Sequence, residues 1–265
     1  MPRFPDDPDE VRMSFAAHLE ELRSRLVRSV VVIGGLFLFG WMLFHKVLAD
    51  IVLRPHRLAV RALGDAAAER GLDEHLQTLS ALEAVFFKLK ISFVAALVIG
   101  LPYLLWQFWS FIAVGLYPRE RRVIQRVLPA ALGLAVAGVL FGYFLLIPLV
   151  NEFLYREIDP DYMKAGIRLQ EYFGLFLMFT VSLTVVFQLP LLLASLGAVG
   201  ILKAKQLRHY RRHCIVGAFV LAAVFTPPDP YSQVLMALPT ILLFEIGVLL
   251  VAYIERRRNA AGTPE

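Results

Sequence analysis

Six apolar runs, separated by polar connections, constrain what this 265-residue chain can fold into. A helix that crosses a bilayer needs about 20 mostly apolar residues. The chain is 58% hydrophobic, whereas an ordinary soluble domain is about 45–50% apolar. The runs therefore predict an all-α, polytopic membrane protein with six transmembrane helices, at residues 26–48, 86–114, 127–150, 172–196, 210–226 and 231–253.

The domain organisation follows from the same runs. We expect one transmembrane domain over residues 14–255, with flexible cytoplasmic tails at 1–13 and 256–265. The fifth and sixth spans should be short. The clean apolar stretch of the fifth runs only from Cys214 to Phe225, before Pro227 and Pro228. A stretch of that length is also compatible with a re-entrant segment.

Basic clusters at every second connection predict the topology. They open the first segment, fill the second-to-third and fourth-to-fifth connections, and follow the sixth. Lys and Arg near membrane ends mark the cytoplasmic side, so both termini should be cytoplasmic, and the alternation requires the fifth segment to cross. The outer connections, 50–80 and 151–171, should cap the outer face, with short helices at 65–70 and 83–87.

Catalytic, metal and cofactor chemistry is not indicated by any motif. The chain has no phosphate-binding loop, nucleophile elbow, zinc-protease motif or paired CxxC. His209 and His213 would share a helix face, but the surrounding arginines oppose a metal ion. Cys214 has no partner for a disulfide. The basic residues indicate topology instead of a nucleic-acid partner, so we expect neither an enzyme nor a cofactor.

Two acidic residues stand out near the predicted inner surface. Glu21 lies on an amphipathic helix whose apolar stripe would lie in the membrane interface. Glu120 is one carboxylate inside a basic cluster. Either residue has a simpler interpretation, which is local charge pairing: Glu21 with Arg25 one helical turn on, and Glu120 with a neighbouring arginine.

Polar residues also occur at the tight turn before the last segment and inside the spans. Prolines make the turn rigid, and Asp229 can cap the following helix. Gln233 then lies about one turn into that helix. Polar groups inside spans are expensive in lipid, so they face protein or water. They form either internal packing bonds or sites for another transmembrane helix: Gln107, Gln188 and Glu245.

Together these segments resemble the TatC family, the multispanning receptor subunit of the twin-arginine protein translocase. The matching motifs fall in the expected order along nearly the whole chain: HLEELRSRL at 18–26, FIA at 111–113, LYPRERR at 116–122, GAF at 217–219, TPPDPYSQ at 226–233 and FEIG at 244–247. Val114 and the residues just before Glu120 depart from the family pattern, but neither departure touches the two acidic residues.

The resemblance implies roles that spacing does not show. Glu21 and Glu120 would bind the Arg-Arg pair of signal peptides, and Arg23 and Phe111 would be functionally sensitive members of the same signal-peptide binding site. Contacts with partner helices would come from Thr226, Asp229, Gln233 and Gln188. Structural roles would fall to prolines at four positions: Pro55, Pro102, Pro227 and Pro228.

The resemblance also implies partners and a location. The family exports folded proteins across the bacterial cytoplasmic (inner) membrane with single-span TatA- and TatB-type subunits, in a multimeric complex energised by the proton-motive force. The alternative function is a secondary transporter of a small solute, which predicts paired ionisable groups near the midplane. An intramembrane enzyme would need a nucleophile and base within the spans, and the sequence offers no such pair.

Overall fold

The computed structural model describes residues 15–114, 118–163 and 165–260, and within them the side chains of 19–111, 128–163 and 165–259. Throughout this part the regular structure is helical, apart from one isolated bridge between Gln77 and Arg168. The predicted all-α class is therefore confirmed. The elements are α1 Phe15–Leu43, α2 His45–Leu63, α3 Asp65–Glu69, α4 Ala81–Val114, α5 Pro118–Phe141, η1 Gly142–Leu146, α6 Ile147–Arg156, α7 Leu169–Val186, α8 Leu189–Val199, α9 Ala204–His209, α10 Arg211–Phe225 and α11 Pro230–Ala260.

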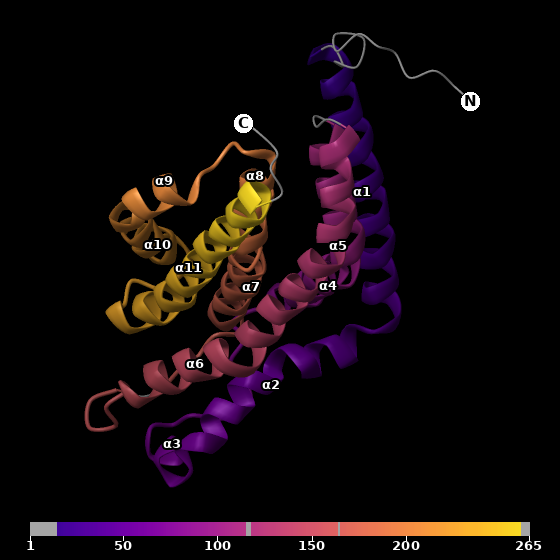
Figure 1. The fold of residues 1–265 in the computed structure, drawn as a ribbon. Helices are drawn as coiled ribbons and strands as arrows, with labels where there is room; N and C mark the ends of the chain where they lie inside the picture. The colour runs from indigo at the N-terminus through magenta and orange to yellow at the C-terminus, as the bar shows by residue number, and fades with distance from the viewer. Residues whose placement is uncertain (1–14, 115–117, 164, 261–265) are drawn as a thin grey trace.

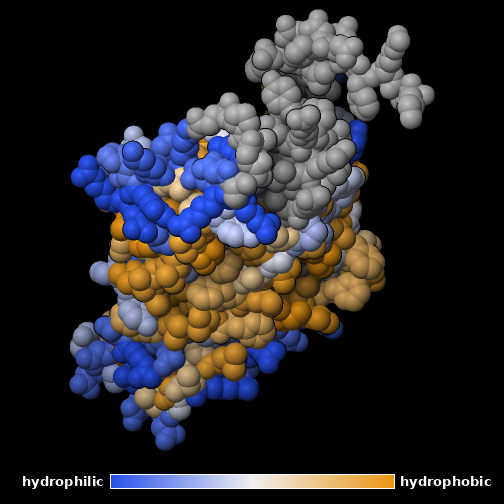
Figure 2. Space-filling view, in the orientation of Figure 1, coloured by the Kyte–Doolittle hydropathy of each residue, from blue (hydrophilic) through white to orange (hydrophobic). Residues whose placement is uncertain are grey.

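The long helices form two groups that meet along α5 (Figure 1). In one group α1 packs on α4, and α4 on α5. In the other, α11 packs on both α8 and α10. Helices α2 and α6 cross each other at one end of the bundle, while α1 begins and α11 ends at the opposite end. A hydrophobic belt lies between two hydrophilic ends on the face shown in Figure 2.

Five described stretches are long and apolar enough to cross a membrane: Leu19–Leu43, Ala81–Phe111, Leu128–Arg156, Leu169–Val199 and Pro230–Asn259. They overlap five of the six predicted segments. The remaining segment, 210–226, coincides with α10, whose 15 residues make a helix of roughly 22 Å. That length is shorter than the hydrocarbon core of a typical bilayer, about 30 Å.

Several features differ from the prediction. The sixth span is not short, because α11 has 31 residues. The first predicted span, 26–48, is too long at its end, because α1 ends at Leu43 and the amphipathic α2 follows. The short helix predicted at 65–70 is present as α3, Asp65–Glu69. The one predicted at 83–87 is not separate, because these residues form the first turns of α4, which begins at Ala81.

Prolines explain where some helices break and where others continue. Pro227 and Pro228 follow the end of α10. The π-helical turn η1 precedes Pro148, and a break at Phe187 and Gln188 precedes Pro190. A proline lacks the backbone N–H that the preceding turn needs, so the helix widens or breaks there. Pro55 and Pro102 instead lie inside α2 and α4.

The cross-over of α2 and α6 is held by a buried polar cluster. His56 is fully buried, with Nε2 3.1 Å from the carbonyl oxygen of Asp73 and Nδ1 2.7 Å from the Tyr155 hydroxyl. A carbonyl only accepts, so Nε2 carries the proton and Nδ1 accepts from Tyr155. Burial lowers the pKa of His56. The Tyr172 hydroxyl donates to Val52 O at 2.6 Å in the same region.

Helices α5 and α7 pack closely because Gly138 of α5 has no side chain at their contact. A Cβ added at Gly138 would lie 2.9 Å from the backbone oxygen of Leu183 and 3.0 Å from the ring of Phe187. A backbone oxygen within a helix cannot move aside independently, so the two helices would have to separate. Gly133, also on α5, has no atom within 4 Å of such a Cβ.

We predict that Gly138→Ala destabilises the fold by about 1–3 kcal/mol, the usual cost of overpacking. Gly133→Ala is the matched control and should be neutral or slightly stabilising, because alanine favours helix. Thermal unfolding of both variants in detergent, followed by tryptophan fluorescence, measures the difference. Equal melting temperatures for the two variants would contradict the packing described.

The buried His56 predicts a pH dependence of stability. Its folded pKa is lowered, so below about pH 6.5 the unfolded chain binds a proton that the folded chain resists. The free energy of unfolding should therefore be greatest above that pH and decrease on acidification, by at most about 1.4 kcal/mol per pH unit. Melting curves between pH 7.5 and 5 should show a shallower decrease for His56→Gln. Identical slopes would show that His56 does not contribute.

Candidate functional site

The carboxylate of Glu21 on α1 is part of a polar chain that links α1 to α4. Arg25 donates to Glu21 Oε1 from Nε at 3.0 Å and from Nη2 at 2.6 Å. The third donor of Arg25, Nη1, reaches Gln107 Oε1 on α4 at 3.0 Å, and Gln107 Nε2 lies 2.7 Å from the Tyr103 hydroxyl. The predicted local pairing of Glu21 with Arg25 is therefore confirmed.

This pairing uses only one oxygen of Glu21. Oε2 is buried and has no hydrogen-bond partner among the described residues. Both Arg25 and Glu21 are about four-fifths buried, with side-chain exposures of 20% and 22%. A carboxylate oxygen held at a fixed position with a free lone pair is a ready acceptor for a second cationic donor.

For the other predicted signal-peptide residues, the structure describes the side chains of Arg23 and Phe111 but not that of Glu120. Arg23 is exposed and makes no hydrogen bond or ion pair with the described residues. Phe111 is partly buried near the end of α4. Glu120 lies in the first turn of α5, but its side chain lies outside the described residues. The arrangement of Glu120 relative to Glu21 therefore stays a prediction.

The turn between α10 and α11 forms a second polar site. Asp229 Oδ1 accepts from the backbone N–H of Ser232 at 2.7 Å, which confirms the predicted helix cap. Its second oxygen, Oδ2, is buried without a hydrogen-bond partner among the described residues, as are the hydroxyls of Thr226 and Ser232. Gln233 Nε2 donates to Phe219 O on α10 at 3.1 Å, which ties the two helices together.

The polar residues predicted inside spans all make internal bonds. Besides the contacts of Gln107, Gln188 Nε2 donates to Ala131 O on α5 at 3.1 Å, while its Oε1 is buried and has no partner in the part of the chain that the structure describes. Glu245 on α11 forms an ion pair with Arg211 at the start of α10. The simpler interpretation is thus confirmed for each, although Gln188 retains one open acceptor.

Buried polar atoms without a partner are few in native proteins, and each calls for an explanation. Eight occur in the described part of the chain, and four of them belong to residues that the sequence predicts as binding sites: Glu21, Gln188, Thr226 and Asp229. The remaining four, which sequence reasoning missed, belong to Arg70, Trp109, Asn151 and Ser232. Ser232 lies between Asp229 and Gln233 in the sequence, so its position within the TPPDPYSQ motif could have identified it as a candidate.

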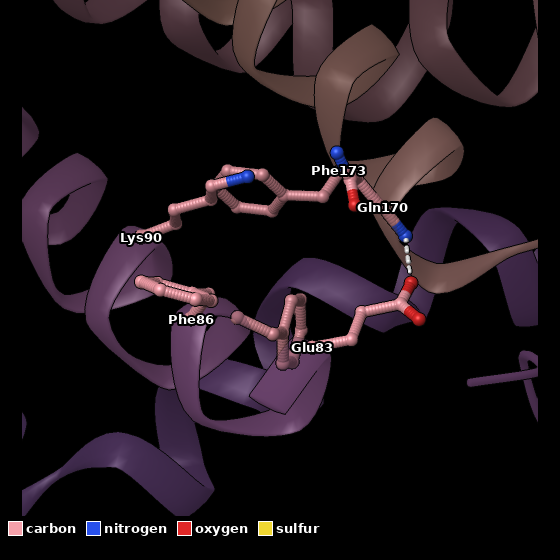
Figure 3. Close-up of a pocket in the computed structure, with 6 residues that line it drawn as sticks. Glu83, Phe86, Lys90, Gln170 and Phe173 are labelled. Carbon is pink, nitrogen blue, oxygen red and sulfur yellow. Dashed lines mark hydrogen bonds between the residues drawn. The ribbon is translucent and has the colours of Figure 1, made fainter. Parts of the chain in front are cut away.

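A cavity of about 390 Å³ lies between the first turns of α4 and α7. Figure 3 shows its lining: Glu83, Phe86, Phe87, Lys90, Gln170 and Phe173. Sequence reasoning did not identify this cavity, because its two walls are more than 80 residues apart in the chain. Within the described residues no group of three His, Cys, Asp or Glu side chains is arranged to hold a metal ion.

Comparison with known proteins assigns the family. The family model for the Sec-independent protein translocase protein (TatC) matches residues 17–239. The TatC protein of Helicobacter pylori is 35% identical over 233 residues, which cover 88% of this chain and 85% of that protein. The TatC protein of Deinococcus radiodurans is 35% identical over 250 residues, which cover 93% of this chain and 88% of that protein.

The fold agrees with this assignment. A crystal structure of the twin-arginine translocase receptor TatC matches with a TM-score of 0.75 and 31% identity, over 90% of this chain and 99% of that one. The same receptor crystallised in the detergent DDM matches with a TM-score of 0.75 and 32% identity, over 88% of this chain and 98% of that one. The chain therefore belongs to the TatC family of Sec-independent protein translocase proteins, as a multi-pass bacterial membrane component of the twin-arginine translocase.

Proposed function

We propose that this chain is the receptor that binds the Arg-Arg pair of signal peptides at the cytoplasmic surface, through Glu21 and Glu120. The observation that carries the proposal is the unpartnered Oε2 of Glu21. An arginine of the signal peptide supplies the donor that this oxygen lacks. A charge-assisted hydrogen bond of this kind contributes about 1.5–3 kcal/mol.

The geometry favours a guanidinium over other donors. Arg25 holds Glu21 Oε1 from one side and is itself anchored to Gln107 on the neighbouring helix. The carboxylate is therefore fixed in orientation before the signal peptide arrives, which reduces the entropy that binding costs. The planar guanidinium fork matches a fixed carboxylate better than the point charge of a lysine. Glu120 supplies the second carboxylate in this proposal.

The proposed topology has six spans with both termini in the cytoplasm. Helix α1 begins at the end of the bundle where α11 ends (Figure 1), and this supports an even number of crossings. Five stretches are long enough to cross unaided, so α10 supplies the sixth crossing as a short span. The basic residues that open α1, fill the α8–α10 connection and end α11 favour the cytoplasmic, positive-inside assignment for that end.

Under this topology the crossing of α2 and α6 lies on the outer side of the cytoplasmic (inner) membrane and caps it. The proton-motive force across that membrane would then energise export of the folded cargo. We also propose self-association of the chain in a multimeric complex, as the family resemblance implies.

We further propose that the α10–α11 hairpin binds the single-span TatA- and TatB-type subunits. Its turn presents the open Thr226 hydroxyl and the open Asp229 Oδ2. Gln233 contributes its amide oxygen, because its Nε2 is already bonded to Phe219 O. Gln188 offers an open oxygen at the α7–α8 break. In lipid such acceptors pair with polar side chains of a neighbouring transmembrane helix.

The alternative of a secondary transporter rests on the Arg211–Glu245 pair. Such proteins place ionisable groups near the midplane at broken helices. Arg211 is half exposed at the first residue of α10 and forms a structural link to α11. This position favours a structural role for the pair, in which it holds α10 against α11, over a role in binding a solute.

We predict that Glu21→Ala strongly reduces crosslinking of a twin-arginine signal peptide to the receptor. The loss should correspond to about tenfold or more in affinity, since one charge-assisted bond of about 1.5–3 kcal/mol is removed. The matched control is Glu20→Ala, which removes the same charge from an exposed neighbouring position. Equal effects of the two changes would contradict a specific contact at Glu21.

Glu120→Ala should reduce the same crosslink while the protein remains inserted in the membrane. A photoreactive residue at position 120 should capture a signal peptide with Arg-Arg in preference to one with Lys-Lys. Equal capture of both peptides would count against a guanidinium site at Glu120.

Partner binding can be tested at two positions of the hairpin. Thr226→Val removes a hydroxyl that has no hydrogen-bond partner among the residues the structure describes, so it should weaken copurification of a single-span subunit without loss of stability. The expected loss is about threefold to tenfold, because such bonds in membranes contribute roughly 0.6–1.5 kcal/mol. Gln233→Leu should weaken it as well, but should also loosen the α10–α11 contact.

Thr240→Val is the matched control for the hairpin, because the Thr240 hydroxyl bonds the Met236 carbonyl within the same helix. Normal recovery of the partner with Thr226→Val, alongside normal recovery with the control, would disprove the proposed contact.

A further inference from the structure

The cavity between α4 and α7 combines one unpaired cation with an aromatic floor. Phe87 and Phe173 are buried beneath it, and Phe86 is exposed at its side. Lys90 extends from α4 toward α7 (Figure 3). The cavity, at about 390 Å³, falls within the range of small-molecule sites, about 300–1,000 Å³.

The two charged groups of the cavity differ in their partners. Glu83 is satisfied on both oxygens: Oε1 accepts from the N–H of Gln170 at 3.1 Å, and Oε2 from the N–H of Leu79 at 2.9 Å. It thereby ties the start of α7 to the start of α4. Lys90, two turns further along α4, makes no hydrogen bond or ion pair with the described residues. Among the described residues, the charged group of the cavity that lacks a counter-charge is therefore the Lys90 amine.

The sequence of α4 places Lys90 at the edge of the hydrocarbon core. The stretch Ala81–Phe111 has 31 residues, about 46 Å of helix, whereas the core is about 30 Å thick. Its charged residues are confined to the first ten positions: Glu83, Lys88 and Lys90. We infer that the core begins just after Lys90, which would put the Lys90 amine at the level of the lipid phosphates.

A separate apolar groove lies further along the same two helices. It is lined from α4 by Val94, Leu97, Val98, Leu101 and Leu104, from α7 by Thr180, Val181, Thr184 and Val185, and from α5 by Val139. On α4 these positions continue the three- and four-residue spacing of the cavity lining, and on α7 Thr180 lies about two turns after Phe173, so on each helix the two sets lie on the same face. The groove has a volume of about 160 Å³, and both threonine hydroxyls bond backbone carbonyls within α7.

We propose that this seam of α4 and α7 is a binding site for one phospholipid, with its phosphate on Lys90. The glycerol and the first methylenes rest on the phenylalanine floor, and one acyl chain follows the apolar groove. A phosphate at the membrane surface supplies the anion that Lys90 lacks, and the groove accepts only hydrocarbon. The bound lipid fills the space that the two helices leave between them.

The test measures lipid retention by the full-length protein. The protein is purified in mild detergent and exchanged into nanodiscs, and native mass spectrometry counts the bound molecules. Phosphatidylglycerol should be retained in preference to diacylglycerol with the same chains, and inorganic phosphate should not displace it. Lys90→Gln should lower retention roughly fivefold, the usual effect of one lysine at an anionic lipid surface.

The matched control is Lys88→Gln, which removes a lysine that is also exposed but does not line the cavity. It should leave retention unchanged, and Lys90→Arg should preserve it. Equal losses with the two Gln variants would overturn the proposal, because they would reveal only a general charge effect. Retention of diacylglycerol as tightly as phosphatidylglycerol would overturn it as well.

Occupancy of the groove is tested by a photoreactive residue at position 97. An adduct with a phospholipid acyl chain supports the proposal. An adduct with a signal peptide or a single-span subunit, without any lipid adduct, would assign the groove to a peptide and overturn it. Neither measurement depends on Glu21 or on signal binding, so this inference and the receptor function can fail separately.

Discussion

The hydrocarbon core of a bilayer offers no water to a polar group, and the structure depends on this constraint. Each polar side chain within the long helices must find its partner inside the protein. The resulting bonds join different helices: Arg25 to Gln107 between α1 and α4, Gln188 to Ala131 O on α5, and Gln233 to Phe219 O between α11 and α10. These tethers fix the register in which the apolar surfaces then pack.

The same constraint explains why the buried polar atoms without a hydrogen-bond partner are informative. A buried acceptor left open inside a membrane protein raises the free energy of the isolated chain, so a partner that fills it gains the corresponding stabilisation. Open acceptors occur on Glu21 at one end of the bundle and on Thr226 and Asp229 at the α10–α11 turn. The first suits an arginine from a peptide, and the second suits polar groups of a membrane helix. Under the proposed function, two kinds of partner would therefore bind without competing for one surface.

Much of this architecture could be predicted from the sequence because it depends on local pattern. The apolar runs, the Glu21–Arg25 pair one turn apart and the Asp229 cap all involve residues close in the chain. The end of α1 at Leu43 and the extension of α4 back to Ala81 were not predicted. Hydropathy marks the hydrocarbon core, whereas these helix ends lie in the interface and are set by contacts between helices.

The contacts that were missed join distant segments. Gln107 was recognised as a polar residue inside a span, but its partner Arg25 lies 82 positions away. The cavity of Glu83 and Lys90 likewise needs α7 as its second wall. His56 reaches Tyr155 across 99 positions. A single sequence carries no signal for such pairs, since neither member has an unusual neighbourhood of its own.

The central claim is that the free oxygen of Glu21 receives a signal-peptide arginine directly. A double-mutant cycle tests it: the affinity of a labelled signal peptide for the receptor in nanodiscs is measured with Glu21 or Gln at position 21, and with Arg-Arg or Lys-Lys in the peptide. Direct contact predicts a coupling energy of at least about 1.5 kcal/mol. Effects that add to within about 0.5 kcal/mol would contradict the account.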